Sequence, residues 1–184
     1  MSPSPALSFA PQLLLQAQDI ALLVLDVDGV LTDGRLYYGP AGEVHKAFNT
    51  LDGHGLKLLQ RAGVQVAIIT GRKSDMVVAR AAELGVAHLV QGTEDKLPAA
   101  QGILARAGLG WAQTAVMGDD WPDAPMFMRA GLRCAPAQAH AELRAQAHFV
   151  SALRGGEGAV REVCDLLLMA RARYREAFDE AFGG

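Results

Sequence analysis

Cysteine is scarce in this sequence, and the two that occur, Cys134 and Cys164, lie far apart without metal-ligand spacing. A chain of 184 residues can bury its core without disulfides, so we expect a reducing, cytoplasmic setting. Basic charge is not in excess either, because 17 Lys and Arg stand against 20 Asp and Glu, which argues against nucleic-acid binding. The N-terminal stretch has no cationic start and no long apolar run, so neither a secretory signal nor a membrane span is predicted.

Short apolar runs are what the sequence does contain, and they alternate with segments of helical spacing. The runs predict strands, each buried on both faces, at residues 21–25, 64–69, 87–90 and 114–117. Helices are predicted at residues 51–61, 74–84 and 96–107, and a short capped helix near the N-terminus. Such alternation is typical of an α/β fold with a parallel sheet and helices on both faces, here as a single domain over residues 1–184.

Two segments interrupt this alternation. Residues 35–48 read as two short strands about the turn GPAG, which predicts a projecting β-hairpin. The glycine-rich residues 154–158 precede a predicted tail helix at about 157–180, with Val160, Val163, Leu167 and Ala170 on one side.

Polar side chains follow several of the predicted strands. Asp26 and Asp28 follow the first, Thr70 the second and Asp119 the fourth, while Lys96 opens the helix after the third. Because the carboxyl ends of parallel strands share one edge of a sheet, we expect these groups to converge. Converging carboxylates need a cation, and oxygen ligands without His or Cys favour Mg²⁺. None of the five histidines of the sequence is assigned to a zinc site.

The same residues match the needs of phosphoryl transfer. Asp26 can attack phosphorus as a nucleophile, and Asp28 can protonate the leaving oxygen and then activate water. Thr70 would donate a hydrogen bond to the phosphoryl group, and Lys96 would neutralise its charge.

At family level, the segments DVDGVLTDG, IITGRK, EDKL and VMGDDWPDAP resemble the four ordered motifs of haloacid-dehalogenase-type phosphatases. With KAFNTLDGHGLKLL, LGVAHLVQG and GGEGAVREVCDLLL, residues from about 20 to 170 resemble the capless 3-deoxy-D-manno-octulosonate 8-phosphate (KDO-8-P) phosphatases. The resemblance implies a three-layer Rossmann-like fold and a Mg²⁺-dependent phosphatase of lipopolysaccharide precursor synthesis in the cytoplasm.

The resemblance also implies the ligands of the site. Mg²⁺ would be bound by the side chains of Asp26 and Asp119 and by the backbone carbonyl of Asp28. Substrate contacts would come from Asp28, Asn49, Thr50, Leu51, Asp52, Gly53, Lys57, Gly71, Arg72, Arg80 and Lys96. The fourth motif departs from the family pattern at Trp121 and Pro122, which leaves the roles of Asp120 and Asp123 open.

No gap between the motifs is long enough for a cap domain, so the cover over the site is expected from neighbouring subunits. The resemblance implies a homotetramer, in which hairpins from several subunits would pair. The segment 154–158 would then reach a neighbouring site, its glycines allowing close backbone approach; the alternative is a flexible loop before an ordinary packing helix.

Three other functions compete with this prediction. A nonulosonate 9-phosphate phosphatase would share the motifs, and the tail GGEGAVREVCDLLL favours the eight-carbon substrate. A phospho-receiver signalling domain also groups aspartates, Thr and Lys, but its phospho-acceptor follows a later strand. A non-catalytic structural subunit is disfavoured because the set from Asp26 to Asp119 is intact.

Overall fold

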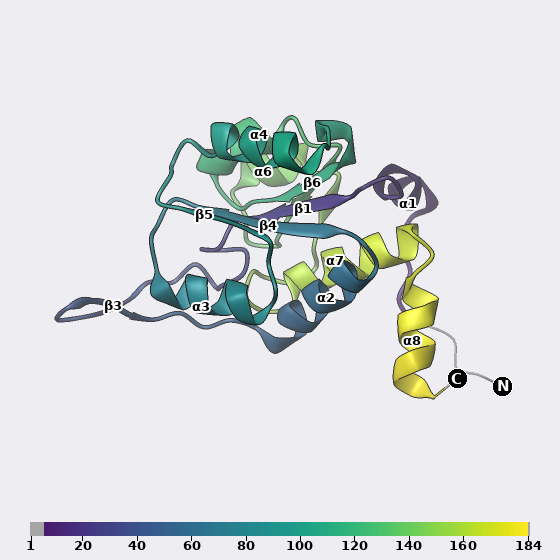
Figure 1. Ribbon diagram of the computed structural model, residues 1–184, viewed down its shortest axis with the longest axis horizontal. Coiled ribbons are helices and arrows are strands. Elements are labelled where there is room, and N and C mark those ends of the chain that lie inside the picture. The colour runs from purple at the N-terminus through teal and green to yellow at the C-terminus, as the bar shows by residue number, and fades with distance from the viewer. Residues whose placement is uncertain (1–5, 184) are drawn as a thin grey trace.

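The central layer of the protein is a six-stranded parallel sheet with the order β5-β4-β1-β6-β7-β8, which runs through the middle of Figure 1. The computed structural model describes residues 6–183. The strands are β1 (Leu22–Leu25), β4 (Gln65–Thr70), β5 (His88–Gln91), β6 (Thr114–Met117), β7 (Leu132–Ala135) and β8 (Phe149–Val150). The parallel sheet is therefore confirmed, with the first strand at its centre. The prediction that each strand is buried on both faces is wrong for β5, because it forms the edge of the sheet and is only half-buried.

Helices cover both faces of the sheet, which confirms the three-layer architecture (Figure 1). One face carries α2 (Thr50–Arg61), α3 (Asp75–Glu83) and α7 (Ala159–Ala170), and the other carries α4 (Lys96–Ala107), α5 (Ala124–Phe127) and α6 (Ala141–Gln146). Alternate residues of β1 supply the two cores, since Leu23 and Leu25 pack with one helical layer and Leu22 and Val24 with the other. Short 3-10 helices occupy Trp111–Gln113 and Trp121–Asp123.

The predicted hairpin is present and projects from the sheet domain (Figure 1). It consists of β2 (Tyr37–Gly39) and β3 (Gly42–His45), joined by Pro40 and Ala41. Gly42 has a φ of +115°, a left-handed conformation that favours glycine in such a turn. The N-terminal helix α1 (Pro11–Ala17) is also present, although no side chain caps it.

The predicted single tail helix is wrong, because the chain forms α7 and then a separate helix α8 (Tyr174–Phe182). The break falls at Ala172, whose φ of +56° ends the helical path. Val160, Val163 and Leu167 are fully buried on α7, as predicted, with Ala170 partly buried beside them. Within residues 6–183, no helix combines the length and the apolar character that crossing a bilayer requires.

Candidate active site

A pocket lies at the carboxyl ends of β1, β4 and β6, where the sequence predicted convergence. It collects all of the predicted catalytic and metal-binding residues, together with several residues that the sequence did not assign. The predicted lining residues are Asp26, Asp28, Thr70, Gly71, Arg72, Lys96 and Asp119. The further lining residues are Glu94, Asp120, Pro122 and Asp123.

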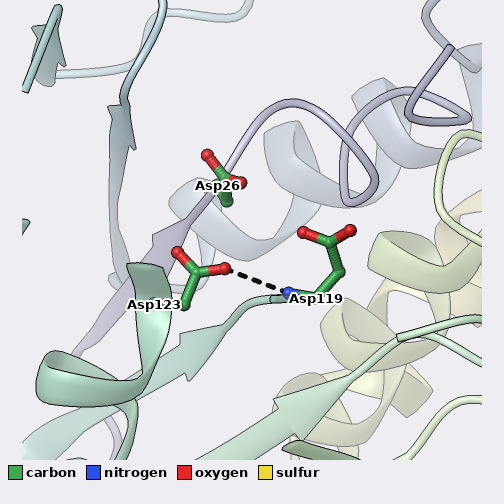
Figure 2. A group of neighbouring side chains, drawn as sticks. All are labelled: Asp26, Asp119 and Asp123. Atoms are coloured by element: carbon green, nitrogen blue, oxygen red, sulfur yellow. Dashed lines mark hydrogen bonds between the residues drawn. The ribbon is translucent and has the colours of Figure 1, made fainter. Parts of the chain in front are cut away.

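Three carboxylates form the centre of this pocket. Asp26, Asp119 and Asp123 each present an oxygen, and these oxygens lie within 4.8 Å of one another (Figure 2). Burial, reinforced by the nearby charge of Asp123, raises the pKa of Asp26 to about 7, although Lys96 opposes the rise. Burial and the charges of Asp26 and Asp123 likewise raise the pKa of Asp119 to about 7. Such crowded carboxylates are unfavourable without a cation, and their oxygen-only donor set fits Mg²⁺.

Asp123 is a member of the group whose role the sequence left open. It is 1% exposed, and its Oδ2 accepts a hydrogen bond from the backbone N–H of Asp119 at 3.0 Å (Figure 2). The same oxygen accepts a second one from the backbone N–H of Asp120 at 3.5 Å. Asp120 itself is exposed at the pocket rim. Asp123 therefore fixes the backbone that carries Asp119. Its signal in the sequence was its spacing of four residues from Asp119, which a 3-10 turn at Trp121–Asp123 brings back toward the strand end.

Lys96 is the first residue of α4, and its side chain contacts both Asp26 and Asp123. Its side chain is buried, and Nζ lies 2.8 Å from Asp26 Oδ1 and 2.7 Å from Asp123 Oδ1. Although burial acts in the opposite direction, the charges of Asp123 and Asp26 raise the pKa of Lys96 above its usual value. Lys96 therefore stays protonated and serves as a fixed positive charge. Thr70, buried at the end of β4, lies in the same pocket.

Asp28 faces a different set of partners from the three central carboxylates. Its Oδ1 forms an ion pair with Lys46, and its Oδ2 lies 3.8 Å from Arg72 Nε. Lys46 follows β3 of the hairpin, and also pairs with Glu43 at 2.9 Å. Sequence reasoning missed Lys46 and Glu43, because nothing in the hairpin sequence shows which of its side chains turn toward the first strand.

The remaining predicted substrate residues do not line this pocket. Thr50, Gly53, Lys57 and Arg80 line a separate surface depression over α2 and α3. Arg80 pairs with Glu83 at 2.8 Å and donates to the backbone oxygen of Asn49 at 3.3 Å. The predicted substrate residues that line a depression therefore fall into two groups, one in the pocket at the strand ends and one in the depression over α2 and α3. The substrate role of the second group stays a prediction.

Asn49, Leu51 and Asp52 line neither the pocket nor that depression, and of these three side chains two have structural partners and one is exposed. Asn49 Oδ1 accepts a hydrogen bond from Leu51 N–H at 2.7 Å and so caps α2, whereas the side chain of Leu51 is exposed. Asp52 is 1% exposed, and its Oδ1 accepts a hydrogen bond from the backbone N–H of Arg161 at 2.8 Å. Because the residue before α7 is Gly158, which has no side chain for capping, Asp52 caps α7 from a different helix.

The glycine-rich segment 154–158 packs against the loop after β1 of its own chain. A Cβ on Gly155 would lie 1.9 Å from the backbone oxygen of Gly29, and Gly156 N–H donates to Val30 oxygen at 3.1 Å. Gln138 bridges the two segments, since its Nε2 donates to Gly29 oxygen at 2.6 Å and its Oε1 accepts from Gly155 N–H at 2.9 Å. The close approach predicted for these glycines occurs within the chain itself, against the loop after β1, and these contacts argue against the flexible-loop alternative. That the segment also reaches a neighbouring site stays a prediction.

Comparisons with known proteins agree with this geometry. A family model described as haloacid dehalogenase-like hydrolase matches residues 85–162. The 3-deoxy-D-manno-octulosonate 8-phosphate phosphatase KdsC of Salmonella typhimurium is 46% identical over 168 residues, covering 91% of this chain and 89% of that protein.

Solved structures of phosphatases have the same fold as this chain. A probable YrbI family phosphatase from Pseudomonas syringae superimposes with a TM-score of 0.93 at 47% identity, covering 95% of this chain and 99% of that one. The 3-deoxy-D-manno-octulosonate 8-phosphate phosphatase from Moraxella catarrhalis, crystallised with a magnesium ion, a phosphate ion and a KDO molecule, has a TM-score of 0.89 at 40% identity, covering 93% of this chain and 98% of that one.

Proposed function

The chain belongs to the 3-deoxy-D-manno-octulosonate 8-phosphate phosphatase family of haloacid dehalogenase-like hydrolases, and we propose that it hydrolyses this sugar phosphate to the free acid sugar and inorganic phosphate. The observation that carries the proposal is the convergence of Asp26, Lys96 and Asp119 in one pocket. Each of these groups has a distinct task in the cleavage of a phosphate monoester.

Asp26 is the nucleophile of the proposed reaction. Its carboxylate attacks phosphorus, the bond to the sugar oxygen breaks, and an aspartyl-phosphate forms on Asp26. The Asp26 and Asp119 side chains and the backbone carbonyl of Asp28 would hold Mg²⁺, which neutralises the crowded carboxylates and the phosphate charge when bound. Lys96, 2.8 Å from Asp26, keeps the attacking carboxylate in place and supplies a second positive charge.

Asp28 and Thr70 complete the transfer. Asp28 gives a proton to the departing sugar oxygen and then takes one from the water that hydrolyses the aspartyl-phosphate. Thr70, at the end of β4, donates a hydrogen bond to the phosphoryl oxygens as their charge shifts.

The substrate carries a carboxylate besides its phosphate, so cations beyond Lys96 are needed. Arg72 stands at the pocket mouth with a side chain that is 38% exposed, and its guanidinium can pair with that carboxylate. Lys57 and Arg80 lie outside the pocket of their own chain, so a role for them in substrate binding needs a site shared between subunits. We therefore include a cytoplasmic homotetramer, in which these residues serve a neighbouring site, and a role in lipopolysaccharide precursor synthesis in the proposal.

The test compares turnover of KDO-8-P with that of a nonulosonate 9-phosphate in the presence of Mg²⁺. We expect a higher kcat/KM for the eight-carbon substrate, and a preference for the nine-carbon one would transfer the proposal to that class. Asp26→Asn should abolish turnover of both esters, because no other group can take up the phosphoryl group. Near-normal activity of this variant, with unchanged Mg²⁺ dependence, would refute the assignment of the nucleophile.

A further inference from the structure

Lys46 is a buried cation that the proposed reaction does not use. Its side chain is 1% exposed, although it belongs to the base of a projecting hairpin. Removing an ammonium group from water costs several kcal/mol unless anionic partners compensate for the loss. Lys46 has two such partners, Glu43 at 2.9 Å on strand β3 and Asp28 on the loop after β1.

Arg72 completes an arrangement of alternating charges. Its guanidinium nitrogens lie 3.8 Å from Asp28 Oδ2 and 3.7 Å from Glu43 Oε2, so two cations face two carboxylates. The two cations differ in access, since the Arg72 side chain is 38% exposed and that of Lys46 is 1% exposed. A substrate in the pocket can therefore reach Arg72, whereas Lys46 can act on the reaction only through Asp28.

The contact with Lys46 separates the two oxygens of Asp28. Oδ1 is occupied by Nζ of Lys46, and Oδ2, 3.8 Å from Arg72, remains as the oxygen that can carry a proton. A short side chain held at one oxygen keeps one rotamer, and proton transfer to a leaving group depends steeply on such positioning.

From this geometry we propose that Lys46 is a positioning residue of the phosphatase, which holds Asp28 in the orientation for protonating the sugar oxygen. The inference rests on the proposed function. In the step concerned, the phosphorus–oxygen bond to the sugar breaks, its electron pair goes to the sugar oxygen, and the proton on Asp28 moves to that oxygen. The hairpin thereby contributes to catalysis within its own chain.

The test uses two esters that differ in their need for a proton. A sugar alkoxide leaves poorly without protonation, whereas p-nitrophenolate leaves unaided. Both measurements follow formation of the aspartyl-phosphate in a single turnover, because its later hydrolysis uses Asp28 as the base whichever ester was bound. In the full-length protein, Lys46→Met should slow release of the sugar from KDO-8-P by about 100-fold, the lower end of what general acid catalysis contributes. Release of p-nitrophenolate should slow by no more than about threefold, with the Mg²⁺ requirement unchanged, because the nucleophile and its cations are untouched. Equal losses for both esters in this step would overturn the inference.

A double-mutant cycle gives a second, independent readout. If Lys46 acts only through Asp28, Lys46→Met should cause no further loss of kcat in the Asp28→Asn background, and additive losses would overturn the inference. Lys46→Arg, which keeps the charge, should recover part of the sugar-phosphate activity. Lys73→Met serves as the control, because this exposed lysine packs on Gly92 and should leave both activities unchanged.

In Lys46→Met the carboxylates of Asp28 and Glu43 face each other without the ammonium group between them, and their repulsion could destabilise the fold. A second variant separates this effect from catalysis. The variant Lys46→Met/Glu43→Gln removes that repulsion and should show the same selective loss for the sugar phosphate. A wild-type protein that turned over neither ester would overturn the proposed function together with the inference. A wild type that turns over both, with variants slowed equally on both in formation of the aspartyl-phosphate, would overturn the inference alone.

Discussion

Gly155→Ala is the substitution for which the structure gives the most direct steric prediction. Gly155 does not have a positive φ, so alanine is allowed by the backbone at this position. The added Cβ, however, would lie 1.9 Å from Gly29 oxygen, 2.5 Å from Gly29 carbonyl carbon and 2.9 Å from Thr32 oxygen. These are backbone atoms, which cannot rotate away as the end of a side chain can.

The size of the effect follows from the shift that is needed. Carbon and oxygen do not approach closer than about 3 Å, so the two segments must separate by about 1 Å. Overpacking of this kind typically costs about 1–3 kcal/mol, from which the chain-entropy gain of alanine subtracts about 0.4–1 kcal/mol. For a chain of this size, a net loss of about 1–2 kcal/mol lowers Tm by roughly 2–8 °C.

Activity should fall as well, because Gly29 has no free space on its other side. A Cβ on Gly29 would lie 2.0 Å from Oδ2 of Asp119, so this loop is enclosed between Gly155 and a proposed metal ligand. We expect Gly155→Ala to weaken Mg²⁺ activation, measured as the Mg²⁺ concentration at half-maximal phosphatase rate. Displacement of the loop that carries Asp28 is the physical cause.

The matched control is Gly110→Ala, an exposed glycine with a φ of −108° and no atom within 4 Å of the added Cβ. Its Tm and its Mg²⁺ activation should equal those of the wild type. Thermal unfolding and phosphatase assays on the three proteins under one buffer decide the matter. A Gly155→Ala protein that matched Gly110→Ala in both measurements would refute the argument that this close approach is intrinsic to the fold.

Two further predictions concern metal removal and helix capping. In the folded protein without metal, Asp26 and Asp119 have pKa values of about 7, compared with the ordinary value of 3.8 in the unfolded chain. The folded state therefore binds their protons more tightly, and their contribution to stability falls as pH rises from about 4 to about 7. Mg²⁺ should therefore raise Tm more at about pH 8 than at about pH 5, and equal increases would contradict this reasoning. Asp52→Ala should lower the free energy of unfolding by about 1–2 kcal/mol through loss of the α7 cap, measured by urea unfolding, whereas unchanged stability would indicate that its carboxylate serves another purpose.

Of the six strands in the central sheet, the sequence predicted β1, β4, β5 and β6 and missed β7 and β8. The runs at β1, β4 and β6 are buried in the sheet, and each stands out against its polar ends. In β7 the short sequence LRCA is interrupted by Arg133, whose guanidinium donates to Gln146 oxygen at 2.7 Å. A charged residue in β7, the second strand from the β8 edge of the sheet, carries no local signal, because its partner lies in a later segment.

The candidate site divides along a similar line. Residues at or just after a strand end, such as Asp26, Thr70 and Asp119, were predictable because sheet topology alone brings strand ends together. Asp52 was not, since an acidic residue in the first turn of a helix reads as exposed, and only the position of α7 shows that it is buried. Lys46 depends in the same way on the direction in which the hairpin leaves the sheet.

The loop that follows β1 shows why the first motif is insufficient by itself to build the site. Its Asp28 is held from the hairpin by Lys46, and its Gly29 is held from the opposite end of the sequence by Gly155 and Gln138. Val27, Val30 and Leu31 anchor this loop in the core, but Asp28 and Gly29 have no apolar side chain that could fix their own conformation to the tolerance that proton transfer requires. Distant segments must therefore supply the rigidity, one through a buried charge and one through direct backbone contact. The same reasoning explains why glycine occurs at position 155, where any side chain would displace the loop that it supports.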